Sequence, residues 1–171
     1  MFSRRFACGL IGAAALVPAS ARAQSVAPAA SKDKPILKIT GKITQFDDTG
    51  NAVFDRNSLE AMGLVSFETM TPWYKSRVKF EGVPIKKLLS VVGAQGDKVI
   101  VTALNDYSTE IPIVDFEAYN VILALRRDGQ YMPVSDKGPL FIVYDFDAHP
   151  EIRTPKYYGR SAWQVARIEV R

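Results

Sequence analysis

Residues 80–93, FEGVPIKKLLSVVG, decide the class of fold. A candidate strand at 78–81 leads into this stretch, and Pro84 opens the clearest helix of the chain. Apolar side chains recur there at the spacing of one helix face, at Ile85, Leu88, Leu89 and Val92, and Gly93 follows directly after them. One face of this helix must therefore pack against a core.

The chain after this helix is mostly β. Four segments are rich in β-branched and aromatic residues: 99–103, 108–113, 120–126 and 140–144. Asp128-Gly129 is a strong hairpin signal between residues 121–125 and 130–132. Residues 163–170 alternate as a last strand, and 115–119 form at most one helical turn.

The segment before the helix adds shorter elements. Residues 36–43 favour a strand, and turn residues at 47–51 lead into a second strand at 52–54. Asp55 or Asn57 can cap a short helix at 58–62 that Gly63 ends, and 64–70 is a further strand. No repeat and no regular strand-helix-strand order is present. We therefore expect an α+β fold, a single β-rich domain over 35–171 with a few short helices.

The N-terminus has the pattern of a cleaved export signal over residues 1–23. Arg4 and Arg5 precede an apolar run at 6–17, and Ala21-Arg22-Ala23 is a small-x-small cleavage site. The run is shorter than the roughly 20 residues of a spanning helix. Export by the twin-arginine route and by the ordinary route both remain open. We expect a periplasmic or secreted protein without a membrane span, joined to its leader by a flexible linker at 24–34.

Removal of the leader changes the charge and the thiol content. Without its three arginines the chain keeps 19 basic and 18 acidic residues, so no basic stripe for a nucleic-acid partner remains. The one cysteine, Cys8, lies in the leader, so the mature chain can form no internal disulfide. His149 is the only histidine, which excludes a structural zinc site of the Cys and His kind. No residue is predicted to be catalytic.

One spacing suggests a metal. Asp145, Asp147 and His149 follow the strand at 140–144 and would project from one face if the strand continued. The alternative is a core strand that ends in a polar loop before Pro150.

Two other groups have a functional and a structural interpretation. Trp73 and Tyr74 could line a pocket for a flat ligand or could close the end of the core. Basic side chains beside turns could bind an anion or could be ordinary surface groups: Arg126, Arg127, Lys137 and Arg160.

Five segments, taken in order, resemble a known family. They are 80–89 (FEGVPIKKLL), 101–108 (VTALNDYS), 121–124 with Asp128-Gly129, 136–140 (DKGPL) and 163–170 (WQVARIEV). This order resembles the molybdopterin-binding domain of the sulfite-oxidase family, and most closely its small, stand-alone, exported members. The similarity covers roughly residues 36–171.

The resemblance implies a β-rich, mixed-sheet domain that, in catalytic relatives, holds a molybdenum-pterin cofactor through a cysteine thiolate from the loop after a strand. The matching segment, 64–73 (LVSFETMTPW), contains no cysteine, and residues 69–71 occupy the neighbourhood. A threonine hydroxyl stays protonated at neutral pH, whereas a thiolate is a soft anionic ligand.

Two functions follow from the resemblance. The first is a binding domain that uses the old cofactor cleft for a small ligand, as an accessory to a redox or sensor protein. The second is a molybdopterin-dependent oxidoreductase that holds its cofactor without a protein thiolate. In either case we expect the cleft to be lined by the same five residues: Trp73, Asn105, Asp106, Tyr107 and Arg126.

Overall fold

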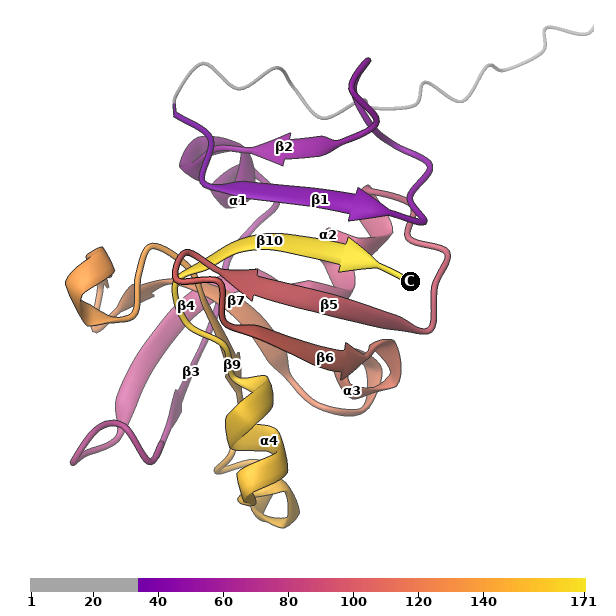
Figure 1. Cartoon of the computed structure of the whole chain (residues 1–171). Coiled ribbons are helices and arrows are strands. Elements are labelled where there is room, and N and C mark those ends of the chain that lie inside the picture. The colour runs from indigo at the N-terminus through magenta and orange to yellow at the C-terminus, as the bar shows by residue number, and fades with distance from the viewer. Residues whose placement is uncertain (1–33) are drawn as a thin grey trace, which may run out of the picture.

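The computed structural model describes residues 34–171, and these form two β-sheets with short helices around them (Figure 1). The predicted signal peptide, Cys8 and all of the predicted linker except Lys34 lie outside the described residues.

The first sheet is mixed and has five strands. Its order is β2 (Ala52–Phe54), β1 (Leu37–Gly41), β10 (Val165–Val170), β5 (Lys98–Ala103) and β6 (Ser108–Pro112). The first and last strands of the chain, β1 and β10, pair in parallel, and the other neighbours are antiparallel.

The second sheet is antiparallel. Its order is β3 (Val65–Thr69), β4 (Val78–Pro84), β7 (Val121–Arg127) and β8 (Gln130–Tyr131), and β9 (Phe141–Tyr144) also pairs with β7. The predicted hairpin at Asp128-Gly129 joins β7 to β8 and is confirmed, since both residues adopt the positive φ that its turn requires.

The α-helices are short. They are α1 (Arg56–Ala61), α2 (Ile85–Val91), α3 (Ile113–Ala118) and α4 (Pro155–Arg160), and the 3₁₀ turns are η1 (Val134–Asp136) and η2 (Pro150–Ile152). Asp55 caps α1 as predicted, by accepting a hydrogen bond of 2.7 Å from the Ser58 amide. The prediction that Pro84 opens the helix is wrong by one residue: α2 begins at Ile85, and Pro84 is its N-cap. Pro84 is still the last residue of β4, where it pairs with Ile122 of β7.

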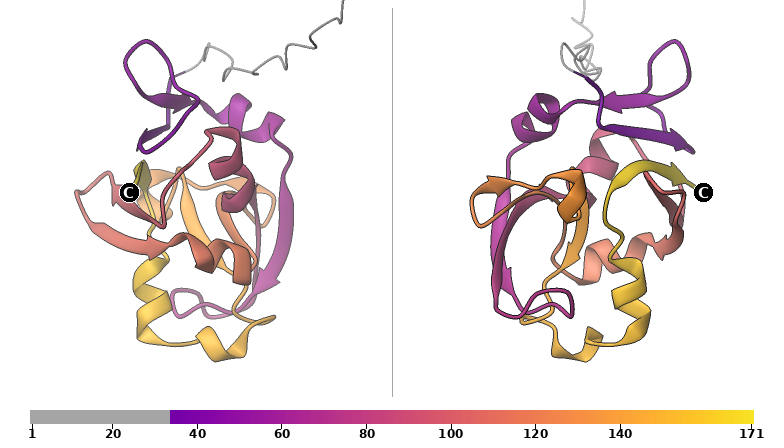
Figure 2. Two further views of the ribbon diagram at one scale, coloured as in Figure 1. Left: turned by 90° about the vertical axis from the view of Figure 1, so that its right-hand side faces the viewer. Right: turned by 60° about the vertical axis from the view of Figure 1, so that its left-hand side comes forward.

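Two further corrections concern helices. The single turn predicted at 115–119 is the six-residue helix α3, which buries Asp115 and Phe116. The helix α4 was not predicted. It lies beyond the edge strand β6, away from α1, and leads directly into β10 (Figure 2).

Two clusters of buried side chains form the core. The larger one joins both sheets and α2, with Ile39, Val101 and Leu123 among its members. The smaller one includes Phe80 and Phe141 and is covered in part by four half-buried side chains, Phe67, Trp73, Tyr74 and Trp163. No helix within residues 34–171 has the length and apolar character needed to cross a membrane.

Candidate functional site

A cleft of about 260 Å³ opens where the loop after β3, the β5–β6 turn, α4 and the segment before β10 meet. Nine residues line it: Trp73, Ala103, Asn105, Tyr107, Tyr158, Gly159, Ser161, Ala162 and Trp163. Three of the five residues predicted for the cleft, Trp73, Asn105 and Tyr107, are therefore brought together.

Trp73 is at the centre of the aromatic contacts in this cleft. Its ring makes edge contacts with Trp163 at 5.6 Å and with Tyr158 at 6.1 Å between ring centroids. The same ring packs on buried Phe141 at 5.4 Å. Trp73 therefore lines a pocket and also closes one end of the core, because its ring covers the smaller core cluster and faces the cleft.

The β5–β6 turn forms another wall. The Tyr107 amide donates a hydrogen bond of 3.2 Å to Asn105 Oδ1, and the Tyr107 hydroxyl donates one of 3.0 Å to the Gly159 carbonyl. The turn is thereby tied to α4. Asp106, at the tip, has a φ of 62° and is not among the residues that line the cleft.

The polar groups of the cleft are few and uncharged. No acidic or basic side chain lines it. Within residues 34–171, the Asn105 amide nitrogen and the indole nitrogens of Trp73 and Trp163 have no hydrogen-bond partner. These uncharged donors suit the acceptor atoms of a flat ligand.

Arg126 does not line the cleft, contrary to expectation. Its guanidinium donates to Glu60 Oε1 at 2.8 Å and to the Tyr131 hydroxyl at 2.9 Å. It also lies over the Tyr131 ring, 4.7 Å from the centroid. Arg126 therefore fastens the β7–β8 hairpin to α1.

The other three basic candidates are also engaged. Arg127 and Lys137 both lie over the ring of Tyr74 and both pair with Asp136. Arg160 donates to the buried carboxylate of Asp115 at 2.6 Å. We find no convergence of these four side chains on one anion site.

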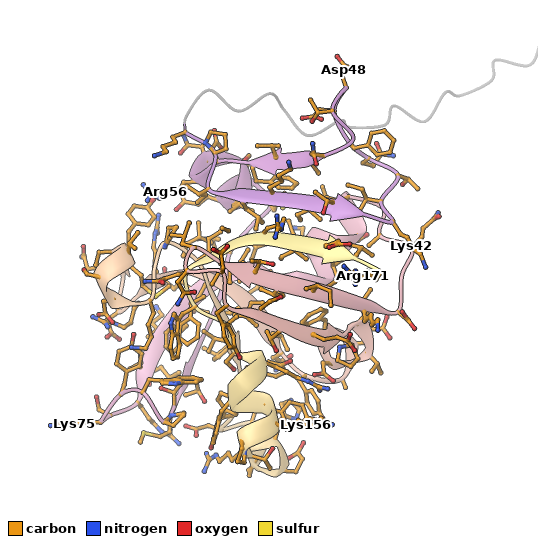
Figure 3. The ribbon with its side chains drawn as sticks, viewed as in Figure 1. Lys42, Asp48, Arg56, Lys75, Lys156 and Arg171 are labelled. Atoms are coloured by element: carbon orange, nitrogen blue, oxygen red, sulfur yellow. The ribbon has the colours of Figure 1, made fainter. Side chains whose placement is uncertain are left out.

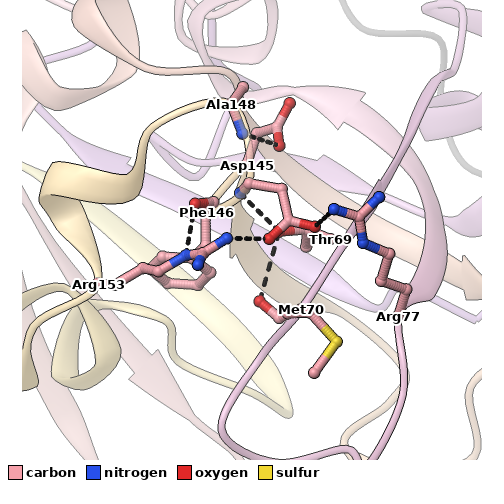
Figure 4. A network of polar contacts seen from close by, with 8 residues as sticks. Thr69, Met70, Arg77, Asp145, Phe146, Ala148 and Arg153 are labelled. Carbon is pink, nitrogen blue, oxygen red and sulfur yellow. Dashed lines mark hydrogen bonds and ion pairs between the residues drawn. The ribbon is translucent and has the colours of Figure 1, made fainter.

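Thr69, in the segment where the resemblance places a metal ligand, has a structural contact. Its hydroxyl is fully buried and accepts a hydrogen bond of 3.1 Å from the Asp147 amide. The Asp147 carboxylate in turn pairs with Arg77 and Arg153 (Figure 4). The hydroxyl of nearby Thr71 is buried and has no hydrogen-bond partner within the described part of the chain.

The three metal candidates do not converge. Asp145 Oδ1 accepts from the Ala148 amide at 3.1 Å, while Asp147 pairs with the two arginines. The His149 ring contacts Tyr119 and pairs with Glu151. No three His, Cys, Asp or Glu side chains among residues 34–171 are placed to hold a metal ion.

Sequence reasoning missed the other six residues of the cleft: Ala103, Tyr158, Gly159, Ser161, Ala162 and Trp163. Trp163 lies in the last segment of the family resemblance, residues 163–170, and this position could have indicated that it belongs to the cleft. Tyr158 and Gly159 belong to α4, for which the sequence has no helical periodicity.

Comparison with protein-family models identifies the family of this domain. Residues 52–145, more than half of the chain, match the family model described as the oxidoreductase molybdopterin binding domain. No curated protein matches the chain. The matched range includes Trp73, Asn105 and Tyr107 but ends before α4 and Trp163. The family match therefore covers one wall of the cleft and not the wall formed by α4 and the segment before β10.

Proposed function

Because the chain belongs to the oxidoreductase molybdopterin-binding domain family, we propose that it keeps this fold as a binding domain. The cleft around Trp73 takes a small, flat, uncharged ligand, such as a heteroaromatic ring. The ligand lies against the indole and phenol rings and accepts hydrogen bonds from Asn105 and the indole N–H groups.

One observation carries this proposal: the cleft combines four aromatic side chains with uncharged donors only. Aromatic walls favour planar ligands through stacking and edge contacts, each contributing about 0.5–1.5 kcal/mol beyond area burial. Its volume, about 260 Å³, lies just below the roughly 300–1,000 Å³ typical of pockets for drug-sized ligands. A ligand of one or two fused rings fits these properties.

The residues of the cleft and of the neighbouring Thr69 segment do not fit a molybdenum-pterin group. The only cysteine of the chain, Cys8, is outside the described residues, so the domain offers no thiolate. The Thr69 hydroxyl is occupied by the Asp147 amide, and no cationic side chain lines the cleft to neutralise a phosphate. An oxidoreductase that holds the group without a protein thiolate is the competing function, and family membership alone supports it.

Export and a protein partner complete the proposal. The leader pattern at 1–23 supports delivery to the periplasm or the medium. A domain that binds a ligand without converting it acts through another protein, so we propose a redox or sensor partner that responds to the occupied cleft.

The test uses protein purified from its native host and two measurements. Elemental analysis for molybdenum, with pterin fluorescence after denaturation, should detect no stoichiometric cofactor. Unsubstituted pterin, a flat ring system that is uncharged at neutral pH, should then quench tryptophan fluorescence by binding beside Trp73 and Trp163. Stoichiometric molybdenum would overturn the binding-domain proposal.

Variants locate the binding site. Asn105→Ala removes one hydrogen bond of about 0.5–1.5 kcal/mol and should weaken pterin binding about two- to tenfold. Trp73→Ala should weaken it further. Phe46→Ala, an exposed aromatic outside the cleft, is the matched control and should leave affinity unchanged. Equal affinities of wild type and Asn105→Ala would remove Asn105 from the site.

A further inference from the structure

A second hollow, of about 610 Å³, lies on one face of the second sheet, and we call it the Asp145 groove. Its apolar lining includes Val65 and Phe67 of β3, Pro84 of β4 and Ile122 of β7. Pro84 and Ile122 are register partners, and Ile122 faces Val143 of β9. Asp145 follows Val143 by two residues and also lines the groove. None of these residues lines the Trp73 cleft.

Asp145 is a buried carboxylate without a cation. Only 9% of the residue is exposed, and Oδ1 accepts a hydrogen bond of 3.1 Å from the Ala148 amide. Among residues 34–171 no lysine, arginine or histidine forms an ion pair with it, and Oδ2 has no hydrogen-bond partner. Burial of a charge is costly unless the charge is paired, so a partner outside the chain would stabilise this side chain.

The other buried or half-buried aspartates of this region show the usual arrangement. Asp115, which is 5% exposed, receives Arg160 and the Tyr144 hydroxyl. Asp147, only two residues from Asp145, receives both Arg77 and Arg153. Asp145 differs from both because it adjoins open space instead of an arginine.

The remaining charges on the lining agree with a cationic occupant. Glu117 and Lys86 lie on the wall with Asp145, so the lining has a net negative charge. Lys86 is exposed and forms no ion pair with Asp145. Phe116 and Tyr119 add aromatic surface, which attracts cations through the ring faces.

We propose that the Asp145 groove binds an organic ammonium compound. The ammonium group donates a hydrogen bond to Asp145 Oδ2, and the apolar body lies on Val65, Phe67 and Ile122. This site is separate from the Trp73 cleft and does not depend on the function proposed for that cleft.

The test compares three probes with the same apolar body: phenethylamine, 2-phenylethanol and 3-phenylpropanoate. Their heads are cationic, neutral and anionic at pH 7. Binding is followed by ¹⁵N-resolved NMR titration, with backbone amides of 65–67 and 120–122 as reporters. Hydrogen bonds to charged groups are about twice as strong as neutral ones, so phenethylamine should bind at least about tenfold more tightly than the alcohol. The carboxylate should bind most weakly.

Asp145→Asn isolates the charge, because its side-chain carbonyl can still accept from the Ala148 amide. In this variant the amine should bind no more tightly than the alcohol, and the affinity for the alcohol should be unchanged. Asp48→Asn removes an equal charge from the turn before β2, where Asp48 projects from the surface (Figure 3), and should keep the preference for the amine.

Three results would overturn the proposal: equal affinity of the wild type for amine and alcohol, perturbed amides confined to residues outside the groove, or a preference for the amine that survives Asp145→Asn. The comparison of probes on the wild type needs no variant, so it tests the groove even if Asp145→Asn fails to fold.

Discussion

The Thr69 hydroxyl accepts a hydrogen bond from the amide of Asp147, 78 positions further along the chain, and so joins the end of β3 to the loop after β9. The contact is buried on the Thr69 side, and the Asp147 carboxylate fastens Arg77 and Arg153 around it. The segment in which catalytic relatives are expected to present a metal ligand is thus part of the framework of this domain.

Thr69→Val should destabilise the domain by about 1–3 kcal/mol, because it leaves the Asp147 amide without an acceptor while keeping the shape of the side chain. Thr69→Ser retains the hydroxyl and should recover most of this loss. Urea unfolding measured by tryptophan fluorescence gives both values. Equal stability of the valine variant and the wild type would show that the hydrogen bond contributes nothing.

The buried group of Asp115, Tyr144 and Arg160 leads to a larger effect. Arg160 and the Tyr144 hydroxyl both donate to Asp115 Oδ2, and burial, together with the Asp115 carboxylate, raises the pKa of Tyr144. Arg160→Ala removes the cation that pairs with Asp115, whose side chain is only 7% exposed. The substitution should lower the free energy of unfolding by about 3–5 kcal/mol, because the buried carboxylate is left unpaired.

Two controls accompany this measurement. Arg167→Ala changes an exposed arginine and should alter the stability by less than about 0.5 kcal/mol. The double variant Asp115→Asn with Arg160→Ala removes both charges of this buried pair and should be more stable than Arg160→Ala alone. If the double variant is the less stable of the two, the unpaired charge is not the source of the loss.

Acid stability should depend on Asp136. Burial raises the pKa of this carboxyl, but the hydrogen bond and charge of Arg127 outweigh burial and hold the pKa below its usual value. A group whose pKa is lower in the folded state stabilises the fold above its unfolded pKa, about 3.9, and this contribution is lost as the pH falls through the folded pKa.

Asp136→Asn should therefore be less stable than the wild type at pH 6, and the difference should disappear as the pH falls below the unfolded pKa of about 3.9 and through the lower folded pKa. Both partners are about one-third exposed, at 31% and 34%, so the difference should stay below about 1 kcal/mol. Urea midpoints over this pH range measure it, and a difference that grows on acidification would contradict the assignment.

Local patterns predicted the elements that depend on local physics. The 3.6-residue period of α2, the Asp55 cap of α1 and the Asp-Gly turn of the β7–β8 hairpin each depend on residues a few positions apart. The helix α4 could not be predicted in this way, since it has no buried residue and no side-chain cap. Its position depends on distant contacts such as that between Tyr107 and Gly159.

The residues of the cleft were predicted only in part, because the cleft also depends on contacts between distant segments. Trp73, Asn105 and Tyr107 are within segments that the family resemblance had aligned, and the structure brings them together. Arg126 was expected in the same cleft on the basis of the family resemblance. The pairing of β7 with β4 shifts in register near Arg126, and the side chain instead meets Glu60. Strand pairing over such separations has no local signature in a single sequence.

The predicted leader leads to a chemical prediction. If export removes residues 1–23, protein from the native host begins at Gln24 and contains no cysteine, because Cys8 is the only one. Mass spectrometry of the N-terminal peptide should then find a chain that begins at Gln24, and a thiol assay under denaturing conditions should give no reaction. A reactive thiol in the purified protein would show that the leader is retained.

The hydrogen bond from the Tyr107 hydroxyl to Gly159 should control how often the cleft opens. Tyr107→Phe keeps the aromatic wall but frees the β5–β6 turn from α4, at a cost of about 0.5–1.5 kcal/mol in the local closing equilibrium. Hydrogen exchange of the amides at 104–107 should then accelerate about two- to tenfold, while exchange in β7 is unchanged. Tyr131→Phe is the matched control, because Tyr131 is similarly exposed, at 43% against 48%, and its hydroxyl donates to Glu60 away from the cleft. Exchange at 104–107 that accelerates equally in both variants would indicate general loosening of the domain, and unchanged exchange in Tyr107→Phe would show that the turn is held by its own Asn105 hydrogen bond.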